Sequence, residues 1–366
     1  MRGWVIAVAA CALAGCAKNS TTSGGDDGSG DGGGSGGGSL AACAIFPSDH
    51  ILNTPIADLP VDPMSSAYLS AIGSAHLHLD LGSDTDPTAD DYYGIPYNVV
   101  HGNSMPWPTA KFYAPALDWD PSQESDCADA SHAVVSPCTN VPVILPIPAD
   151  PAVEGGLNMS ADQTPDDDHH TLIVDADTCR LWEVYHTYEN AGTFNIFGAA
   201  TWDLSSDDLR PAGWTSTDAA GLPILPLLLR AEEADTGTIA HALRFTVEDS
   251  AIQTAYNWPA RHDTGANTNT SDPPMGQLFR LKSSYTIPAN YNTQAKAILT
   301  AMQTYGMYIA DGGSSWYVTG EPSADWQDDT FDQVQSVSGA WFEAVDITAI
   351  TSRSGFDMDS AKVPAP

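Results

Sequence analysis

The chain has 366 residues, and its 47 acidic against 13 basic side chains give a formal net charge of −34 at pH 7. Nucleic-acid binding needs clustered Lys and Arg, so a surface this acidic excludes a nucleic-acid partner and matches anionic membrane faces poorly. We expect the charge to keep the protein soluble in an extracellular or salty setting.

The first residues have the layout of an export signal. Arg2 supplies a positive charge, and the apolar run at 4–13 is too short to span a bilayer. The run ends in LAGC at 13–16, which resembles the lipobox of bacterial lipoprotein signal peptides. The resemblance implies removal of residues 1–15 and acylation of Cys16, which would anchor the protein in the cell envelope. Because Ala17 and not Asp follows this cysteine, we expect the lipidated protein at the outer membrane or the cell surface. The alternative to a lipoprotein signal is an ordinary secretory signal peptide with an unrelated cysteine.

A flexible tether follows. Residues 20–39 are all Gly, Ser, Thr or Asp, which have nothing to bury and predict a solvated coil over 16–39. Its aspartates lack the spaced ligands of a calcium-binding loop, so no cofactor is predicted. A requirement of the protein for calcium stays an open alternative. Residues 40–366 then predict a single β-rich globular domain. No later apolar run approaches the length of a membrane span, so we expect membrane contact only through the lipid.

The domain has the pattern of short strands separated by turns. β-branched and aromatic residues gather in runs that Pro, Gly, Asp and Asn bound, as is typical of strands. We predict a mostly β fold, an antiparallel β-sandwich of jelly-roll-like or lectin-like type with one or two short helices. The expected strands lie at 95–100, 142–147, 171–175, 180–188, 194–202, 238–247, 278–283, 307–310 and 316–319.

One helix is expected at 292–305. Gly306 follows where a left-handed cap would end it, and weaker helical patterns cover 65–72 and 331–337. The apolar residues of the first helix recur at helical spacing and are Ala295, Ile298, Leu299, Met302 and Tyr305.

Of the six cysteines, Cys11 lies in the predicted signal peptide and Cys16 is the predicted lipidation site, so four remain in the domain. An even number in an oxidising compartment predicts structural disulfides, and none of the spacings is that of a zinc knuckle. Three pairings are possible. We favour Cys127 with Cys138, which closes a short loop, and Cys43 with Cys179, which ties the start of the domain to its middle.

A set of short segments runs through the domain: YYGIPY at 92–97, LRPAGWT at 209–215, AGLPI at 220–224, HALRFT at 241–246, WPARH at 258–262, PPMG at 273–276, YGM at 305–307 and WY at 316–317. Together they resemble a largely uncharacterised family of secreted bacterial proteins that is common in soil bacteria. The resemblance runs from about residue 47 to residue 346. It implies a family of β-rich secreted proteins and implies no catalytic residue.

A predicted hairpin carries the first candidates for acid–base chemistry. Residues 176–179 lie between two strand-like runs, and a two- or four-residue connection would pair His170 with Tyr185. Glu183 would then share a face with His170, roughly 7–8 Å away between backbones. An imidazole and a carboxylate in one cleft can act as acid and base. A three-residue connection would put them on opposite faces. The alternative to an acid–base pair is a solvent-exposed His and Glu on a polar face of the sheet.

Two further histidines are candidates. His241 opens an alternating run and lies on its apolar face, where a histidine is more often a core residue than a ligand. His262 follows Trp258 and Arg261 and precedes a polar loop, a setting typical of binding sites.

Metal and nucleotide chemistry have little support. Three histidines with Glu183 could form a mononuclear site of cupin type, but the only His-x-His, at 76–78, lies far from the other candidates in the sequence, so no metal ligand is predicted. The motifs of serine hydrolases, zinc proteases, nucleoside triphosphatases and dehydrogenases do not occur in a credible context.

Carboxylates and tryptophans indicate a carbohydrate. Glu183, Asp203 and Asp218 are candidates for a mechanism in which one acid protonates the leaving oxygen and the other acts as nucleophile or base. Trp214 and Trp258 could stack on sugar rings, although most of the ten tryptophans must lie in the core.

We therefore expect a cell-surface carbohydrate-active enzyme whose partner is a polysaccharide or another glycan. The leading hypothesis is a glycoside hydrolase that uses Glu183 with Asp203 or Asp218, because an acidic surface disfavours anionic substrates. The alternatives are a polysaccharide lyase, in which a histidine abstracts a proton, and a non-catalytic glycan-binding or adhesion lipoprotein. The candidate bases of the lyase are His170 and His262, and the candidate substrate-binding residues are His241, Arg244, Arg261, Trp214, Trp258 and Lys282.

Overall fold

The computed structural model describes residues 40, 43–81, 94–113, 120–156, 168–190 and 192–365. These residues belong to one compact unit, Ser35–Pro366. The predicted signal peptide, the lipid at Cys16, the whole tether, Tyr92 and Tyr93 lie outside the described residues. None of the described helices is both long enough and apolar enough to cross a membrane.

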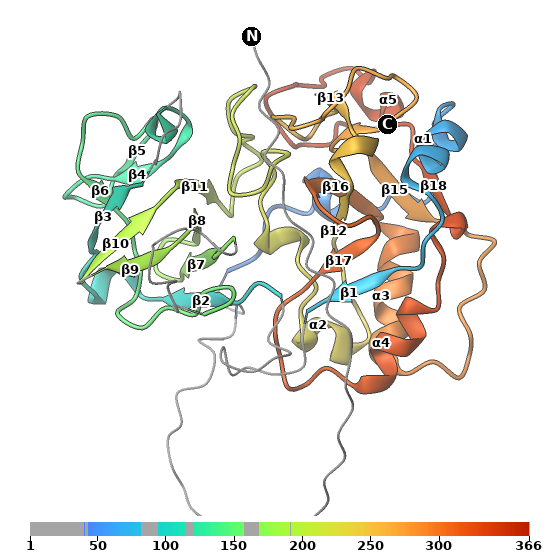
Figure 1. Ribbon diagram of the computed structural model, residues 1–366, viewed down its shortest axis with the longest axis horizontal. Helices are drawn as coiled ribbons and strands as arrows, with labels where there is room; N and C mark the ends of the chain where they lie inside the picture. Colours follow the sequence, from blue (N-terminus) through green and yellow to red (C-terminus); the bar gives the residue numbers. More distant parts are fainter. Residues whose placement is uncertain are drawn as a thin grey trace, which may run out of the picture. The chain divides into compact units, whose positions relative to one another are not determined.

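Two sheets make up the first half of this unit, on the left of Figure 1. Their strands are β2 (Tyr97–Val100), β3 (Thr109–Phe112), β4 (Cys127–Ala128), β5 (Val134–Val135), β6 (Val143–Ile144), β7 (Thr171–Asp175), β8 (Arg180–Tyr185), β9 (Tyr188–Asn190), β10 (Thr193–Ile196) and β11 (Gly198–Asp203). One sheet has the order β11-β8-β7-β2 and the other the order β5-β4-β6-β3-β10-β9. Both contribute to one hydrophobic core, which buries Trp182 of the first sheet and Ile196 of the second.

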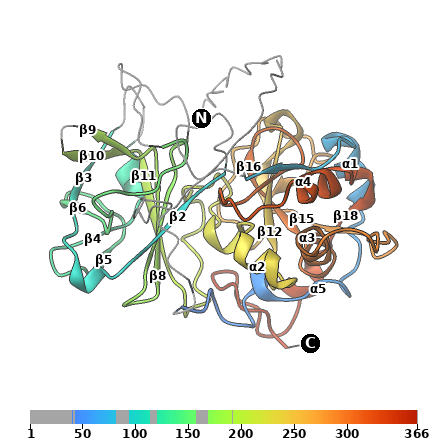
Figure 2. The same cartoon turned by 90° about the horizontal axis from the view of Figure 1, so that it is seen from below.

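The second half, on the right of Figures 1 and 2, is a six-stranded sheet with helices packed against it. Its strands are β1 (His78–Asp80), β12 (Leu243–Val247), β15 (Leu278–Leu281), β16 (Met307–Gly312), β17 (Tyr317–Thr319) and β18 (Phe342–Ala344), in the order β1-β17-β12-β16-β15-β18. β13 (Gln253–Tyr256) and β14 (Pro274–Met275) form a separate ribbon. The helices are α1 (Ser65–Ile72), α2 (Ala231–Thr236), α3 (Thr293–Thr304), α4 (Asp328–Gln335) and α5 (Thr348–Thr351).

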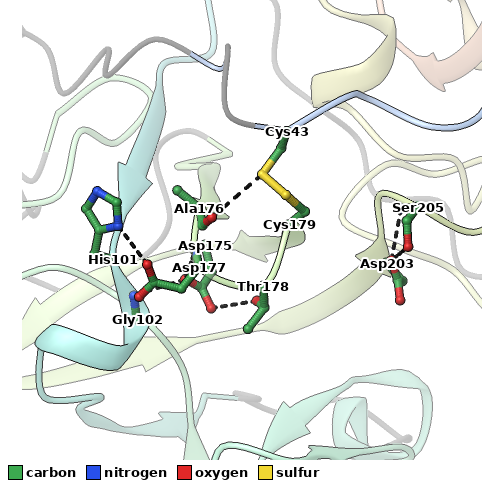
Figure 3. The surroundings of a disulfide bond; sticks show 10 residues. All are labelled: Cys43, His101, Gly102, Asp175, Ala176, Asp177, Thr178, Cys179, Asp203 and Ser205. Carbon is green, nitrogen blue, oxygen red and sulfur yellow. Dashed lines mark hydrogen bonds and ion pairs between the residues drawn. A yellow bond between two sulfur atoms is a disulfide. The ribbon is translucent and has the colours of Figure 1, made fainter.

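The hairpin of β7 and β8 has the register that the sequence predicted for a four-residue connection. Asp175 pairs with Arg180, and the carboxylate of Asp175 accepts hydrogen bonds from the backbone N–H of Gly102 at 2.9 Å and from the Thr178 hydroxyl at 2.6 Å. Cys179 ends this connection and is bonded to Cys43, so the start of the unit is fixed to the hairpin (Figure 3).

A β-bulge interrupts the pairing of β12 with β16. Phe245 pairs with Ile309, but the next residue, Thr246, pairs with Asp311, so Ala310 is the extra residue. Phe245 lies in the core, and without the bulge the side chain of Asp311 would face that core. The bulge turns Asp311 to the same face of the sheet as Thr246, and bulges commonly re-aim a side chain in this way.

The β-rich class, the helix at 292–305 and both disulfides are confirmed. α3 spans Thr293–Thr304 because the Asn292 side chain accepts a hydrogen bond from the backbone N–H of Ala295 at its start and Gly306 adopts a φ of 79° after its end. The disulfides are Cys43–Cys179 and Cys127–Cys138.

Two parts of the fold prediction need correction or stay open. The described residues form five α-helices instead of one or two, because α2 and α5, with six and four residues, are too short to show a helical period in the sequence. Each sheet also contains a parallel pair, such as β2 with β7 and β12 with β16. The three larger sheets are therefore mixed and the two-stranded ribbon is parallel, so the antiparallel sandwich stays a prediction.

Candidate functional site

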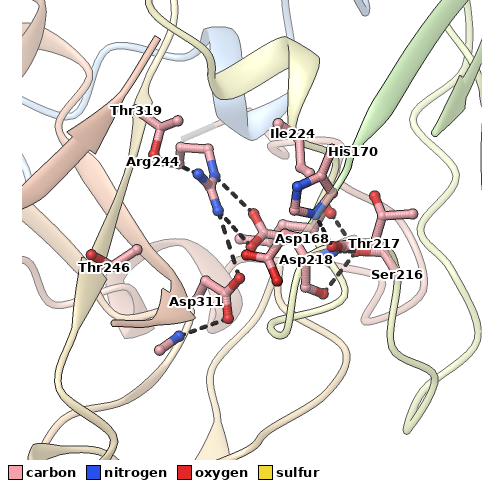
Figure 4. A network of polar contacts seen from close by, with 12 residues as sticks. Asp168, His170, Ser216, Thr217, Asp218, Ile224, Arg244, Thr246, Asp311 and Thr319 are labelled. Atoms are coloured by element: carbon pink, nitrogen blue, oxygen red, sulfur yellow. Dashed lines mark hydrogen bonds and ion pairs between the residues drawn. The ribbon is translucent and has the colours of Figure 1, made fainter. Parts of the chain in front are cut away.

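A cluster of ionisable side chains lies between the β7–β8 hairpin and the six-stranded sheet (Figure 4). Thr217 and Asp218 connect the two sides. The Thr217 hydroxyl donates to the carboxylate of Glu183 on β8 at 3.0 Å, and the Asp218 carboxylate accepts two hydrogen bonds from Arg244 on β12, at 2.7 and 2.9 Å. This short segment therefore holds charged groups of the two sheets together.

Glu183 is fully buried at the inner side of this cluster. Trp182 and Val184 point into the core of the first half, so alternation along β8 directs Glu183 to the opposite face. Its carboxylate accepts hydrogen bonds from the backbone N–H groups of Ile224 and Leu225, both at 2.9 Å, besides that of Thr217. Burial raises the pKa of Glu183 to about 7, although these hydrogen bonds act in the opposite direction.

His170 lies beside Glu183 and is also buried. Its Nδ1 is 2.5 Å from the carboxylate of Glu154, and its Nε2 is 2.8 Å from the carbonyl oxygen of Thr217. Burial by itself would lower the pKa of His170, but the charge and hydrogen bond of Glu154 outweigh burial and raise the pKa to about 10. We therefore describe His170 as an imidazolium that donates from both ring nitrogens.

Asp311 is the carboxylate of the cluster that combines partial exposure with a strongly shifted pKa. Its side chain is 27% exposed and lies 3.9 Å from the Arg244 guanidinium. Desolvation raises the pKa of Asp311 well above its usual range, and the neighbouring carboxylate of Asp218 raises it further, while Arg244 lowers it. The result favours a protonated carboxyl group at the edge of the cluster.

Asp168 is a second, more exposed carboxylate at this edge. It accepts a hydrogen bond from the Tyr185 hydroxyl at 3.0 Å, and its negative charge contributes to the raised pKa of Asp311. Burial and the charge of Asp168 raise the pKa of Tyr185, so the phenol stays a hydrogen-bond donor. Asp311 and Asp168 thus keep exposed surface, whereas Glu183, His170 and Asp218 of the same cluster are buried.

The structure brings together Glu183, His170, Asp218 and Arg244 from the predicted residues. His262 adjoins them, because its Nδ1 is 2.9 Å from the carbonyl oxygen of Ala219, the residue after Asp218.

Asp203 does not belong to this cluster. It pairs with Arg180, whereas Glu183 pairs with Ala200, so Asp203 lies three positions along β11 and on the opposite face. It is bound to the Ser205 hydroxyl at 2.6 Å and to Arg180 at 3.6 Å. The structure therefore places Glu183 and Asp203 on opposite faces of their sheet, and the predicted pairing of these two carboxylates gains no support.

The remaining predicted substrate-binding residues have partners elsewhere in the unit. His241 contacts Glu233 of α2, and Lys282 donates to the carbonyl oxygen of Ala340. The others are Arg261, which binds Met358 and Asp359, Trp258, which donates to Ser360, and Trp214, which stacks with Arg210.

Asp311, Asp168, Glu154 and Tyr185 were not among the predicted site residues. The signal for Asp311 was its place at the end of a predicted strand, just before two glycines, where functional side chains often lie. Asp168 stood next to the predicted hairpin, in a run of three aspartates that offered no reason to single it out.

Within the described residues no three His, Cys, Asp or Glu side chains are arranged to hold a metal ion, so the cupin-type alternative gains no support there. No protein-family model matches the chain, and neither a curated protein nor a solved structure matches it.

Proposed function

We propose that the protein is a glycoside hydrolase in which Asp311 is the general acid and Asp168 is the second carboxylate. The observation that carries this proposal is the partly exposed carboxyl group of Asp311, 3.9 Å from the Arg244 guanidinium, whose pKa desolvation and the charges of Asp218 and Asp168 raise well above its usual range. Glycoside hydrolysis needs one protonated acid and one ionised carboxylate on the same substrate bond.

In the proposed reaction Asp311 gives its proton to the glycosidic oxygen as the bond from that oxygen to the anomeric carbon breaks. The leaving sugar departs as an alcohol, and the Asp168 carboxylate either attacks the anomeric carbon or removes a proton from the attacking water. The Tyr185 hydroxyl orients Asp168 through its hydrogen bond. Arg244, held by Asp218, stands beside Asp311 and stabilises the carboxylate that the proton transfer creates.

Glu183 and His170 have supporting roles in this proposal. Glu183 is fully buried and its oxygens are occupied by Thr217, Ile224 and Leu225, so it positions the segment that carries Asp218. The Glu154 carboxylate raises the pKa of His170 to about 10, and the charged ring that this favours is a poor acceptor for a proton from a uronate. This favours hydrolysis over the lyase reaction with His170 as base.

We further propose that the enzyme acts on a polysaccharide at the cell surface, anchored through a lipid on Cys16, as a member of the secreted bacterial family that its segments resemble. The antiparallel sandwich fits the first half of the unit best, where two sheets share one core.

The direct test is incubation of the full chain in detergent with a panel of neutral and acidic polysaccharides. New reducing ends without absorbance from unsaturated uronate support the hydrolase, whereas both signals together indicate a lyase. Silence across the panel, with retention on one glycan column, would leave a binding protein and refute the enzyme.

Matched variants connect the activity to the site. We expect Asp311→Asn and Asp168→Asn each to lower kcat by about 10²–10⁴, the usual contribution of general acid–base catalysis. Asp203→Asn removes an exposed carboxylate outside the cluster and should retain kcat within about twofold, in line with a surface substitution. Equal losses in all three variants would contradict the assignment.

A further inference from the structure

One tryptophan next to β18 is exposed to solvent. Trp341 has 43% of its surface exposed, whereas every other tryptophan that the structure describes is buried or half-buried. Four of those others also donate the indole N–H to a backbone carbonyl oxygen at 2.8–3.0 Å, namely Trp107, Trp258, Trp316 and Trp326. Trp341 has no such bond within the described part of the chain, so neither burial nor hydrogen bonding explains a tryptophan at this position.

The exposed ring is fixed by its surroundings. The backbone N–H of Trp341 donates to the carbonyl oxygen of Ser338 at 3.0 Å, and its carbonyl oxygen accepts from the backbone N–H of Lys282 at 2.9 Å. The ring of Tyr285 packs against the indole with 5.2 Å between ring centroids and 68° between ring planes. Gln303 of α3 donates to the carbonyl oxygens of Lys282 and Tyr285 at 3.1 and 3.0 Å. An aromatic ring that is already ordered loses little conformational entropy when a ligand binds.

We call Trp341, Tyr285 and Lys282 the Trp341 platform. Its neighbours in the sequence are small or polar, because Ser283, Ser284 and Ala340 are exposed. Within 273–340, all of which the structure describes, no other large hydrophobic side chain is exposed. Binding to a bilayer surface needs an apolar face of several side chains. A sugar needs less, since one aromatic ring can cover its flat C–H face while hydroxyl and ammonium groups bind its edge.

The charge around the platform selects the kind of sugar. The chain has 47 acidic residues, yet none lies within 273–310. The Lys282 ammonium donates to the carbonyl oxygen of Ala340 at 2.9 Å, which holds it beside Trp341, and it takes part in none of the ion pairs that the described residues form. Glu343, the acid nearest to Trp341 in the sequence, is already bound to Arg280 at 2.8 Å. The charge of Lys282 is therefore available to an anionic ligand.

We propose that the Trp341 platform is a glycan-binding site for the uronate residues of an acidic polysaccharide, with the sugar ring stacked on Trp341 and its carboxylate on Lys282. The platform shares no residue with the Asp311 cluster. The proposal therefore concerns binding alone, and a silent polysaccharide panel in the test for hydrolysis would leave it unaffected.

The probe is sodium polygalacturonate, titrated into the full chain in detergent, with two matched control polymers. Fully methyl-esterified polygalacturonate keeps the sugar rings without the charge, and poly-L-glutamate keeps carboxylates without sugar rings. In about 0.15 M sodium chloride the rest of the protein's negative charge is screened beyond about 8 Å. We expect polygalacturonate to bind about three- to fivefold more tightly than its methyl ester, the upper range for an exposed ion pair, and poly-L-glutamate not to bind.

Three variants separate the ring from the charge. Trp341→Ala should weaken the binding of both sugar polymers about tenfold or more, as for an aromatic anchor of an interface. Lys282→Gln should weaken only polygalacturonate, to the affinity of the methyl ester. Lys111→Gln, on the exposed side of β3, makes the same change in net charge and should leave all affinities unchanged. Circular dichroism checks that each variant is folded, and Lys282→Gln by itself tests the site if Trp341→Ala does not fold.

Several results would overturn the proposal. They are equal affinities of the wild type and a folded Trp341→Ala variant, equal affinities for polygalacturonate and its methyl ester, binding of poly-L-glutamate as tight as that of polygalacturonate, and no binding of either sugar polymer. Binding to phosphatidylglycerol vesicles that Trp341→Ala abolishes would assign the platform to a membrane surface instead. A dimer in analytical ultracentrifugation that Trp341→Ala dissociates would assign it to a second copy of the chain.

Discussion

Burial acts in opposite directions on the two neighbouring groups Glu183 and His170. It raises the pKa of the Glu183 carboxyl group to about 7, because the ionised form loses its water. For His170 burial favours the neutral ring, and the adjacent Glu154 carboxylate is the main contact that raises its pKa, with smaller contributions from Asp168 and the Thr217 carbonyl oxygen. The charge states of Glu183 and His170 therefore depend on the contacts of each side chain and not on the residue type alone.

Glu183→Gln tests the state of the buried carboxyl group. A carboxyl group whose pKa is raised from 4.5 to about 7 by folding destabilises the native state as the pH rises between these values. Glutamine has no such titration, so the loss of unfolding free energy between pH 5 and pH 8 should be about 2–3 kcal/mol smaller in the variant than in the wild type. Urea denaturation at both pH values measures this difference. The exposed Glu189→Gln should leave the loss unchanged, and an equal loss in wild type and Glu183→Gln would contradict the raised pKa.

Glu154→Gln tests the ion pair of His170. In the wild type the raised pKa stabilises the fold below the unfolded value of 6.5, and this stabilisation is lost as the pH rises through about 10. Without the carboxylate, burial remains and should lower the pKa of His170 below 6.5. NMR of the imidazole protons between pH 5 and pH 10 follows both forms. A wild-type ring that titrates near 6.5 would refute the assignment.

At the scale of elements, the hairpin and α3 were predictable because their signals are local. The connection at 176–179 and the alternation of β7 and β8 define the register that puts Glu183 on the His170 face. Asn292 and Gly306 mark the ends of α3. The bulge of β16 has no such signal, since it depends on the pairing with β12, and without the bulge Asp311 would point into the core.

The two disulfides should stabilise the fold unequally. Cys43–Cys179 closes a loop of 136 residues and Cys127–Cys138 one of 11. Loop-closure entropy then predicts losses of about 5 kcal/mol for Cys43→Ser with Cys179→Ser and about 3 kcal/mol for Cys127→Ser with Cys138→Ser. Chemical denaturation of the two double variants gives the values. A larger loss for the short loop would show that native contacts, and not chain entropy, determine the effect.

At the scale of the whole molecule, the net charge of −34 predicts self-repulsion in the folded state. Sodium chloride screens this repulsion, so the Tm should rise between 20 and 300 mM salt by at least about 2 °C, which corresponds to roughly 1 kcal/mol. Thermal unfolding followed by circular dichroism measures it. Calcium chloride at the same ionic strength should give the same rise, and a much larger rise with calcium would indicate a specific site.

The amino-acid sequence by itself determined the β-rich class and α3, because these depend on local periodicity and capping residues. It left alternatives for the hairpin register and for the cysteine pairing, and favoured the pairing that the structure shows. It also placed Glu183, His170, Asp218 and Arg244 among the candidates. Only the tertiary structure decided the surroundings of these side chains. Glu183 is buried, the Glu154 carboxylate contacts His170, and the bulge directs Asp311 to the face of the sheet that carries Thr246. Burial, charge pairing and strand pairing arise between segments distant in the sequence, so no local pattern could have shown them.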